Sequence, residues 1–135
     1  MHGKVRVLYL LDTHTLLWAL TEPSRLGKNA YRIIEDRNSV LYVSPASAWE
    51  IGTKQRLGKL PQADFLIAGY SDYLNQLGVQ RLPITDHHAM VAGSMEWQHK
   101  DPFDRMLASQ AILESLTLIT CDSVFGTLRA LKYVW

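Results

Sequence analysis

Four acidic residues that lie far apart in the sequence have the setting of a shared active site: Asp12, Glu50, Asp104 and Asp122. Asp12 and Asp122 each follow an apolar run of strand length. Glu50 and Asp104 lie in the first two turns of predicted helices. Carboxylates held close together repel one another, and burying an unpaired one is costly. Such a cluster therefore needs protons or cations to neutralise it.

Hard divalent cations are the neutralising partners that these residue types favour. Mg²⁺ and Mn²⁺ prefer oxygen ligands and readily share carboxylates with substrate phosphates. The chain offers no cysteine pair for zinc, and its adjacent His87 and His88 would point about 100° apart on a helix. A metal held by carboxylates lowers the pKa of a bound water and stabilises charge on a phosphoryl oxygen. The residues themselves therefore predict metal-assisted hydrolysis of phosphodiesters.

Alternating strand-like and helix-like segments position these acids. Apolar runs predict strands at residues 5–11, 40–43, 79–82 and 116–120, with an edge strand near 133–135. Helices are predicted between them at residues 13–20, 24–36, 45–57, 62–77, 85–97 and 102–115. This alternation predicts an α/β fold with a mostly parallel sheet covered by helices on both faces. Ligand sites in such sheets lie beyond the carboxyl ends of the strands, so we expect the four acids on one rim.

Helix-end signals support this arrangement. Ser24 is predicted to cap the helix that runs to Asp36. Ser44 and Asp101 each precede a proline, which is the typical beginning of a helix, and Gly78 is predicted to end one. Asp101 is therefore interpreted as a helix cap before it is considered as a metal ligand.

Each acid also has an ordinary structural interpretation. Asp12 could cap a helix, and Asp122 could begin a turn. Glu50 could lie on a helix surface and pair with Lys54 four residues later. Asp104 has the position at which an acid favours the helix dipole. Their expected common location, rather than any one of them, favours a site.

Composition sets the remaining bounds. The 135 residues predict a single domain over 1–135, and 47% are hydrophobic, which suffices for a core. The net charge of +1 does not by itself argue for a nucleic-acid partner. The longest apolar runs fall far short of the ~20 residues that cross a membrane, so no membrane association is expected. A lone Cys121, expected as a small buried strand residue, fits a reducing compartment, and we expect a cytoplasmic location.

Five short segments carry a resemblance to a known family. They are 10–18 (LLDTHTLLW), 47–51 (SAWEI), 57–60 (LGKL), 101–105 (DPFDR) and 118–122 (LITCD). In this order and spacing, from about Val7 to Trp135, the chain resembles the PIN-domain ribonucleases, and among them the VapC-type toxins of bacterial toxin–antitoxin pairs. Many members have Asn two residues after the first Asp, whereas this chain has His14, as a subgroup of the toxins does.

The resemblance implies a three-layer α/β/α sandwich in a single PIN-like nuclease domain. It implies Mg²⁺- or Mn²⁺-dependent endonucleolytic hydrolysis of RNA by a metal-activated water. Carried over by position, Asp12 and Asp104 would be the principal metal ligands. Glu50 would be a further ligand or a water-positioning acid, and Asp122 would be the more loosely engaged acid on the side of the second metal. Asp101 ranks below Asp104 as a ligand.

The resemblance also implies partners: an RNA substrate, a cognate antitoxin that covers the site and the helices near the amino terminus, and a second copy in a homodimer. The apolar Leu16, Leu17, Trp18 and Leu20 would suit a partner surface, with core packing as the alternative. Basic residues near the acids would line an RNA path or lie on solvated helix ends: Lys54, Arg56, Lys59, His99, Lys100 and Arg105.

Three other functions compete with this interpretation. A receiver-like signalling domain is also α/β and needs Mg²⁺, but it requires paired acids after its first strand and a Lys at a late strand end. Here Asp12 stands alone after Leu11. A catalytically silent PIN scaffold would act only through partner binding. A nuclease directed at DNA would cleave flapped DNA better than RNA.

Overall fold

The computed structural model describes residues 6–135, and five parallel strands form the central sheet. They lie in the order β3-β2-β1-β4-β5. The strands are β1 (Leu8–Leu11), β2 (Val40–Val43), β3 (Gln80–Arg81), β4 (Thr117–Ile119) and β5 (Lys132–Val134). Every pairing is parallel, so the predicted sheet is confirmed. The first strand begins three residues later than predicted from Val5, which itself lies outside the described residues.

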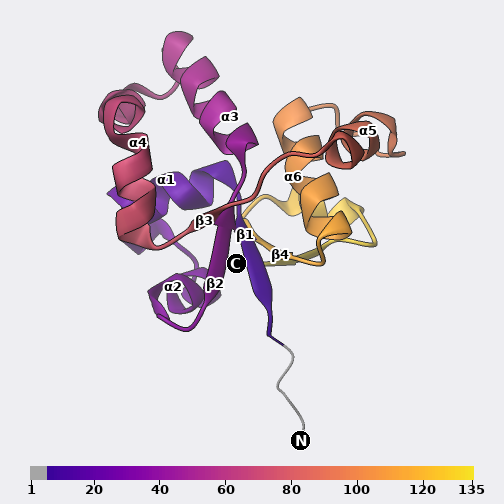
Figure 1. Cartoon of the computed structure of the whole chain (residues 1–135), viewed down its shortest axis with the longest axis horizontal. Coiled ribbons are helices and arrows are strands. Elements are labelled where there is room, and N and C mark those ends of the chain that lie inside the picture. The colour runs from indigo at the N-terminus through magenta and orange to yellow at the C-terminus, as the bar shows by residue number, and fades with distance from the viewer. Residues whose placement is uncertain (1–5) are drawn as a thin grey trace, which may run out of the picture.

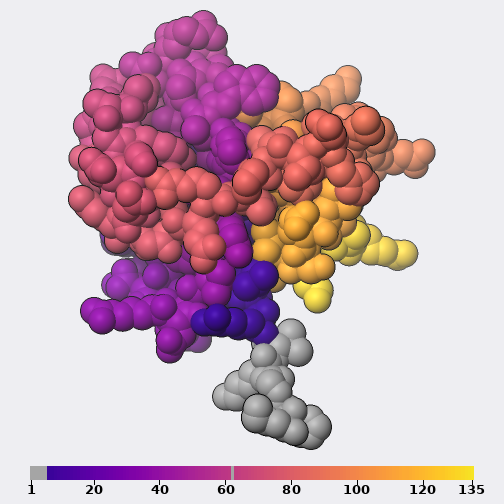
Figure 2. All heavy atoms as spheres, in the orientation of Figure 1, coloured from indigo at the N-terminus to yellow at the C-terminus, as the bar shows by residue number. Residues whose placement is uncertain are grey.

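In the described part of the chain, six α-helices cover the two faces of this sheet. They are α1 (Thr13–Thr21), α2 (Lys28–Glu35), α3 (Pro45–Arg56), α4 (Asp64–Leu77), α5 (Asp86–Ser94) and α6 (Pro102–Leu113). Figure 1 shows α1, α2 and α4 on one side of the sheet and α5 and α6 on the other. The expected three-layer α/β/α sandwich is therefore confirmed. In the space-filling view, the connection from β3 to α5 crosses this face of the molecule between the two helical layers (Figure 2).

Two hydrophobic cores fill the space between the sheet and its helices. Successive residues of a strand point to opposite faces, so Leu11 packs into one core and Leu10 into the other. The first core gathers buried side chains from α1, α2, β2, α3 and α4, and the second gathers those of α6, β4 and the segment after it. The helices α1, α3 and α6, which begin next to or carry Asp12, Glu50 and Asp104, each contribute buried side chains to these cores.

The predicted helix ends are largely confirmed. Ser44 caps α3, because its hydroxyl accepts a hydrogen bond of 3.0 Å from the Ala46 N–H. Asp101 caps α6, which places Asp104 at the third helical position. Gly78 ends α4 with a φ of 80°, a left-handed conformation that favours glycine. Among the described residues, no helix is long and apolar enough to cross a membrane.

Two helix predictions were wrong in extent. The helix predicted from Ser24 begins only at Lys28, and Pro23–Arg25 form a separate 3₁₀ turn. Gly27 lies between them, where a Cβ would come within 2.6 Å of the Trp135 side chain. Leu26 and Gly27 have extended backbone, with ψ of 143° and 162°, which separates the two elements, and the approach of Trp135 leaves no room for a side chain at Gly27. Local sequence does not reveal this long-range contact. Helix α5 ends at Ser94, three residues before the predicted end at Trp97.

The order of the strands creates a crevice at the centre of the sheet. From β1 the chain moves to β2 and β3 on one side, and later to β4 and β5 on the other. Connections leave the neighbouring strands β1 and β4 in opposite directions, which opens a space beyond their carboxyl ends. Asp12 follows β1 directly, and Asp122 follows β4 within three residues.

Candidate active site

A cavity of about 460 Å³ lies beyond the carboxyl ends of β1 and β4. The side chains that line it come from four separate segments of the chain: Asp12, His14, Trp18, Glu50, Lys54, His99, Asp101, Asp104, Cys121 and Asp122. All four acids predicted from the sequence are among them. Five carboxylates and a single ammonium group, that of Lys54, therefore share one cavity in the described part of the chain.

Asp12 is the most firmly held of these acids. It is 7% exposed, and it accepts hydrogen bonds from the Thr13 N–H and the Thr120 hydroxyl, both at 2.7 Å. Burial raises the pKa of Asp12 above its usual value, the two hydrogen bonds oppose this, and the charge of Glu50 adds to it. The predicted helix-cap role is also present, because Asp12 caps α1. Thr120 was missed from sequence, since a hydroxyl at a strand end gives no signal of its partner.

Glu50 lies on the inner face of α3 and is 4% exposed, so its alternative placement on the surface is wrong. The predicted pairing with Lys54 is present, and the ammonium group donates to Oε2. The other oxygen, Oε1, is buried and has no hydrogen-bond partner among the described residues. A buried carboxylate oxygen without a partner is costly, which indicates that this position awaits a cation or a donor from a ligand.

Asp104 faces the same cavity from the first turn of α6, and its side chain is 14% exposed. The His99 ring nitrogen Nε2 lies 2.7 Å from its Oδ2. Burial is the main cause that raises the pKa of Asp104 to about 6, although the contact with His99 lowers it. The surrounding negative charges raise it further, namely those of Asp101, Asp12 and Glu50. Three acids therefore interact electrostatically with Asp104.

The two remaining acids are held by helix ends. Asp101 accepts from the N–H groups of Phe103 and Asp104, at 2.9 and 3.0 Å, as a helix cap does. Asp122 is exposed and accepts from the Val124 N–H at 3.0 Å at the beginning of a 3₁₀ helix, Ser123–Thr127. Asp122 is thus both a turn residue, as its ordinary interpretation predicts, and a lining residue of the cavity.

Cys121 does not have the predicted environment. It was expected to be a buried strand residue, but β4 ends at Ile119 and the thiol is exposed at the cavity. Partial burial and the charge of Asp12 raise the pKa of this thiol. A raised thiol pKa lowers the thiolate fraction, so Cys121 lacks the electropositive setting of a nucleophilic cysteine.

The residues predicted to form a partner surface or an RNA path differ in their burial and contacts. Leu16 and Leu17 are core residues, so the core alternative is confirmed for them, whereas Trp18 and Leu20 are half-buried. Arg105 fits neither of its predicted roles, because its guanidinium group donates to four main-chain carbonyl groups. Three basic residues are exposed: Arg56, Lys59 and Lys100.

The donor set suits a hard divalent cation. Oxygen atoms of carboxylates predominate in the cavity, and Glu50 Oε1 is buried and unpartnered. Within residues 6–135, no three His, Cys, Asp or Glu side chains are grouped closely enough to hold a metal ion as they stand. Three of the acids have protein partners in this structure: Thr120 for Asp12, Lys54 for Glu50 and His99 for Asp104.

A family comparison identifies the fold family. The model of the PIN domain family matches residues 9–131, which contain all four predicted acids. The chain belongs to the PIN domain family. No curated protein sequence matches this PIN domain.

Solved structures share the architecture at low sequence identity. VapBC2 from Rickettsia felis, bound to a DNA fragment from its promoter, matches with a TM-score of 0.71 and 17% identity, over 96% of this chain and 99% of that one. DNA-bound VapBC from Salmonella typhimurium matches with a TM-score of 0.64 and 15% sequence identity, over 95% of this chain and 97% of that one. A toxin–antitoxin complex from Klebsiella pneumoniae matches with a TM-score of 0.61 and 16% sequence identity, over 94% of this chain and 96% of that one. These matches show that the fold extends over nearly the whole chain.

Proposed function

We propose that this PIN domain is a Mg²⁺- or Mn²⁺-dependent endoribonuclease and the toxin of a toxin–antitoxin pair, in a single nuclease domain over residues 1–135. The observation that carries the proposal is the acid cavity. Among the described residues it is lined by five carboxylates and one ammonium group, one buried carboxylate oxygen has no hydrogen-bond partner, and the pKa of Asp104 is raised to about 6. Such an excess of buried negative charge is stable only with bound cations or protons, and cations are what phosphodiester hydrolysis requires.

Asp12, Glu50 and Asp104 would hold the metal, and the more exposed Asp122 would complete the side of a second one. When bound, the metal lowers the pKa of a water and stabilises charge on the phosphoryl oxygens. The common cavity at the end of the sheet, where these carboxylates lie, would also set where the scissile phosphate of an RNA strand binds.

Neighbouring side chains set the orientation of these acids. The Thr120 hydroxyl and the Thr13 N–H fix both oxygens of Asp12. The His99 ring holds one oxygen of Asp104. Groups of this kind, one contact behind the metal ligands, orient them, and their removal typically weakens metal binding by about 10- to 100-fold. Lys54 neutralises part of the charge on Glu50 and stands beside the phosphate position.

The partner part of the proposal is an antitoxin, together with a homodimer. Structures of the same fold are described as VapBC or toxin–antitoxin complexes, which supports the partner class. The half-buried Trp18 lines the acid cavity, so a partner that covered this residue would also block the site. Co-purification with the product of an adjacent gene tests the antitoxin, and light scattering of the isolated chain tests the dimer.

Cleavage of RNA by purified protein tests the enzymatic part. We expect a short single-stranded RNA to be cut internally with Mn²⁺ or Mg²⁺ and to stay intact in chelator. Asp12→Asn should reduce the rate by at least about 100-fold, because it removes a charged ligand while keeping the shape of the side chain. Asp72→Asn on the exposed side of α4 is the matched control and should cleave at the wild-type rate.

Equal cleavage by Asp12→Asn and wild type would overturn the mechanism. Absence of cleavage by a folded wild-type protein would favour the catalytically silent scaffold. Faster cleavage of flapped DNA than of RNA would replace the RNA substrate with DNA.

A further inference from the structure

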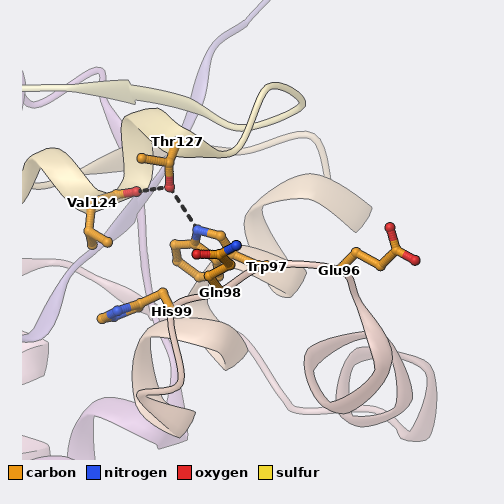
Figure 3. A pocket seen from close by; sticks show the side chains of 6 residues that line it. All are labelled: Glu96, Trp97, Gln98, His99, Val124 and Thr127. Atoms are coloured by element: carbon orange, nitrogen blue, oxygen red, sulfur yellow. Dashed lines mark hydrogen bonds between the residues drawn. The ribbon is translucent and has the colours of Figure 1, made fainter.

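A second cavity, of about 630 Å³, shares a lining residue with the acid cavity, and the side chains that line it are drawn in Figure 3. It is lined by Glu96, Trp97, Gln98, His99, Val124 and Thr127. His99 lines both cavities and lies 2.7 Å from Asp104 through its Nε2 atom. A molecule bound in one cavity would therefore lie next to a molecule bound in the other.

The Trp97 indole is held in a fixed position in this second cavity. Its Nε1–H donates to the Thr127 hydroxyl at 2.8 Å, and that hydroxyl donates to the Val124 carbonyl oxygen at 2.6 Å, as the dashed lines of Figure 3 show. The indole ring centroid lies 4.9 Å from that of His99 and 5.9 Å from that of Phe125. A half-buried aromatic ring fixed in this way loses little freedom when a flat ligand stacks on it.

The segment that carries Trp97 and His99 is attached to the helix of Asp104. The Arg105 guanidinium group donates to the carbonyl oxygens of Trp97 and His99, at 2.8 and 2.9 Å. It also donates to those of Ala92 and Met95, at 2.7 and 2.5 Å, where α5 ends. One side chain of α6 therefore fixes the second cavity relative to the acid cavity.

We propose that this second cavity binds an unpaired nucleobase of the RNA, from a nucleotide next to the scissile phosphate. The proposal rests on the proposed ribonuclease function. Single-stranded RNA is recognised mainly by stacking of bases on aromatic side chains and by hydrogen bonds to their edges. Trp97 and His99 provide the aromatic surfaces, and the Gln98 amide provides edge contacts. A cavity of this volume lies in the usual range for small organic groups.

The charge of the cavity favours a base over a phosphate. Among the described residues that line it there is no Lys or Arg, and there is one acid, Glu96. The Glu96 side chain points away from Trp97 and His99 in Figure 3. Among the described lining residues a phosphate would meet no lysine or arginine here, whereas a neutral base needs none. The phosphate thus belongs to the acid cavity with its cations, and the base belongs to this one.

Binding of RNA with single missing bases tests the proposal. The probe is a short, fluorescently labelled oligouridylate and a series of copies, each with one abasic position, titrated by anisotropy with Ca²⁺ and checked for intactness on a gel. We expect one abasic position to weaken wild-type binding by about five- to tenfold, the lower range for a lost stacked base. Trp97→Leu should bind the intact RNA more weakly by the same factor and lose this dependence on the missing base.

Trp49→Leu is the matched control, because Trp49 is 62% exposed on α3 and lines neither of the two cavities. It should keep the wild-type dependence. A wild-type protein that is insensitive to every abasic position would overturn the subsite, as would a penalty that persists in Trp97→Leu.

A measurement on the wild-type protein keeps the proposal testable if Trp97→Leu does not fold. Oligouridylate with single 5-iodouridines should photocrosslink to the peptide that contains Trp97, at one RNA position. Crosslinks confined to other peptides would overturn the proposal. If the protein cleaves RNA but Trp97 has no effect on binding or cleavage, the base-binding subsite is wrong and the ribonuclease function stands. If binding depends on the base but no RNA is cleaved, the ribonuclease function is wrong and the base-binding subsite stands.

Discussion

Two contacts between a histidine and a carboxylate look alike in distance and differ in construction. His88 Nε2 lies 2.8 Å from Glu114, and His99 Nε2 lies 2.7 Å from Asp104. In the first contact the histidine is buried, with a side chain 2% exposed, and the acid is 45% exposed. In the second the histidine is 27% exposed and the acid only 14%. The two contacts thus bury opposite partners.

This difference separates a structural contact from a reactive one. His88 Nδ1 accepts from the Thr85 N–H in the cap of α5, so Nε2 carries the proton and donates to Glu114 next to the end of α6. The charge of Glu114 stays in water. Asp104 instead takes its charge into a cavity with other acids, and its pKa rises to about 6. A buried histidine joins two helices, whereas a buried acid stores electrostatic repulsion that a cation can relieve.

The largest expected difference between the two contacts is in stability. His88→Ala should lower the free energy of unfolding by about 3 kcal/mol, because it opens a cavity and removes the side-chain acceptor of the Thr85 N–H, one half of the capping box of α5. His99→Ala should lower it by about 1 kcal/mol, the usual contribution of a partly exposed hydrogen bond. Urea denaturation in chelator measures both. Equal losses would contradict the distinction between the two histidines.

Replacing the acid of the second contact, Asp104, should stabilise the metal-free protein, whereas replacing either histidine should destabilise it. The pKa of Asp104 is about 6 in the folded state against a usual 3.8, so the folded chain binds this proton more tightly. Without metal, the stability contributed at this position therefore falls as pH rises from about 4 to about 6, by at most about 3 kcal/mol. Asp104→Asn removes that loss, and the metal-free variant should be about 1–2 kcal/mol more stable than wild type at pH 7.5.

Glu114→Gln is the matched control and should change stability by less than about half a kcal/mol, because its partner stays hydrogen-bonded and its charge is solvated. Addition of Mn²⁺ should raise the Tm of wild type and leave that of Asp104→Asn nearly unchanged. A metal-free Asp104→Asn protein that is less stable than wild type at pH 7.5 would show that repulsion is not stored at this acid.

The smallest expected effect concerns the hydroxyl that holds Asp12. Thr120→Val removes the 2.7 Å bond to Asp12 and the 3.0 Å bond from the Asp122 N–H, and should cost about 1–2 kcal/mol of stability in chelator. Thr21→Val is the matched control, since the Thr21 hydroxyl donates to the Leu17 carbonyl oxygen of its own helix and, among residues 6–135, to no site residue. It should change stability by less than about half a kcal/mol. An equal decrease in Tm in Thr120→Val and Thr21→Val would show that the Thr120 hydroxyl does not stabilise the site.

Local patterns in the sequence were sufficient to predict the fold and to locate the acids. The apolar run that ends at Leu11 and the proline after Asp101 are signals within a few residues, and each places one acid at the end of an element. The contacts that arrange the site are long-range. Thr120 reaches Asp12 across 108 positions, and the glycine before α2 is required by Trp135 at the far end of the chain. Single-sequence periodicity contains no information on such pairs.

The burial of two residues was also not predictable from local sequence: Cys121 was expected to be buried and is exposed, whereas Glu50 could have been exposed and is buried. Cys121 was placed in a strand that ends two residues earlier, and strand ends are the least certain part of a periodic pattern. Glu50 has apolar neighbours on both sides, so the sequence left its face undecided until packing of α3 buried it.

Arg105 holds the backbone of the segment before α6, and this leaves the side chains of that segment open to substitution. Each of its hydrogen bonds there goes to a main-chain oxygen, including those of Trp97 and His99. Replacing Glu96 or Gln98 would leave every one of these bonds in place. Sequence drift in this segment can therefore alter what the surface recognises without moving the backbone that presents it. Directed evolution of residues 96–98 should accordingly change preference among RNA sequences at little cost in stability.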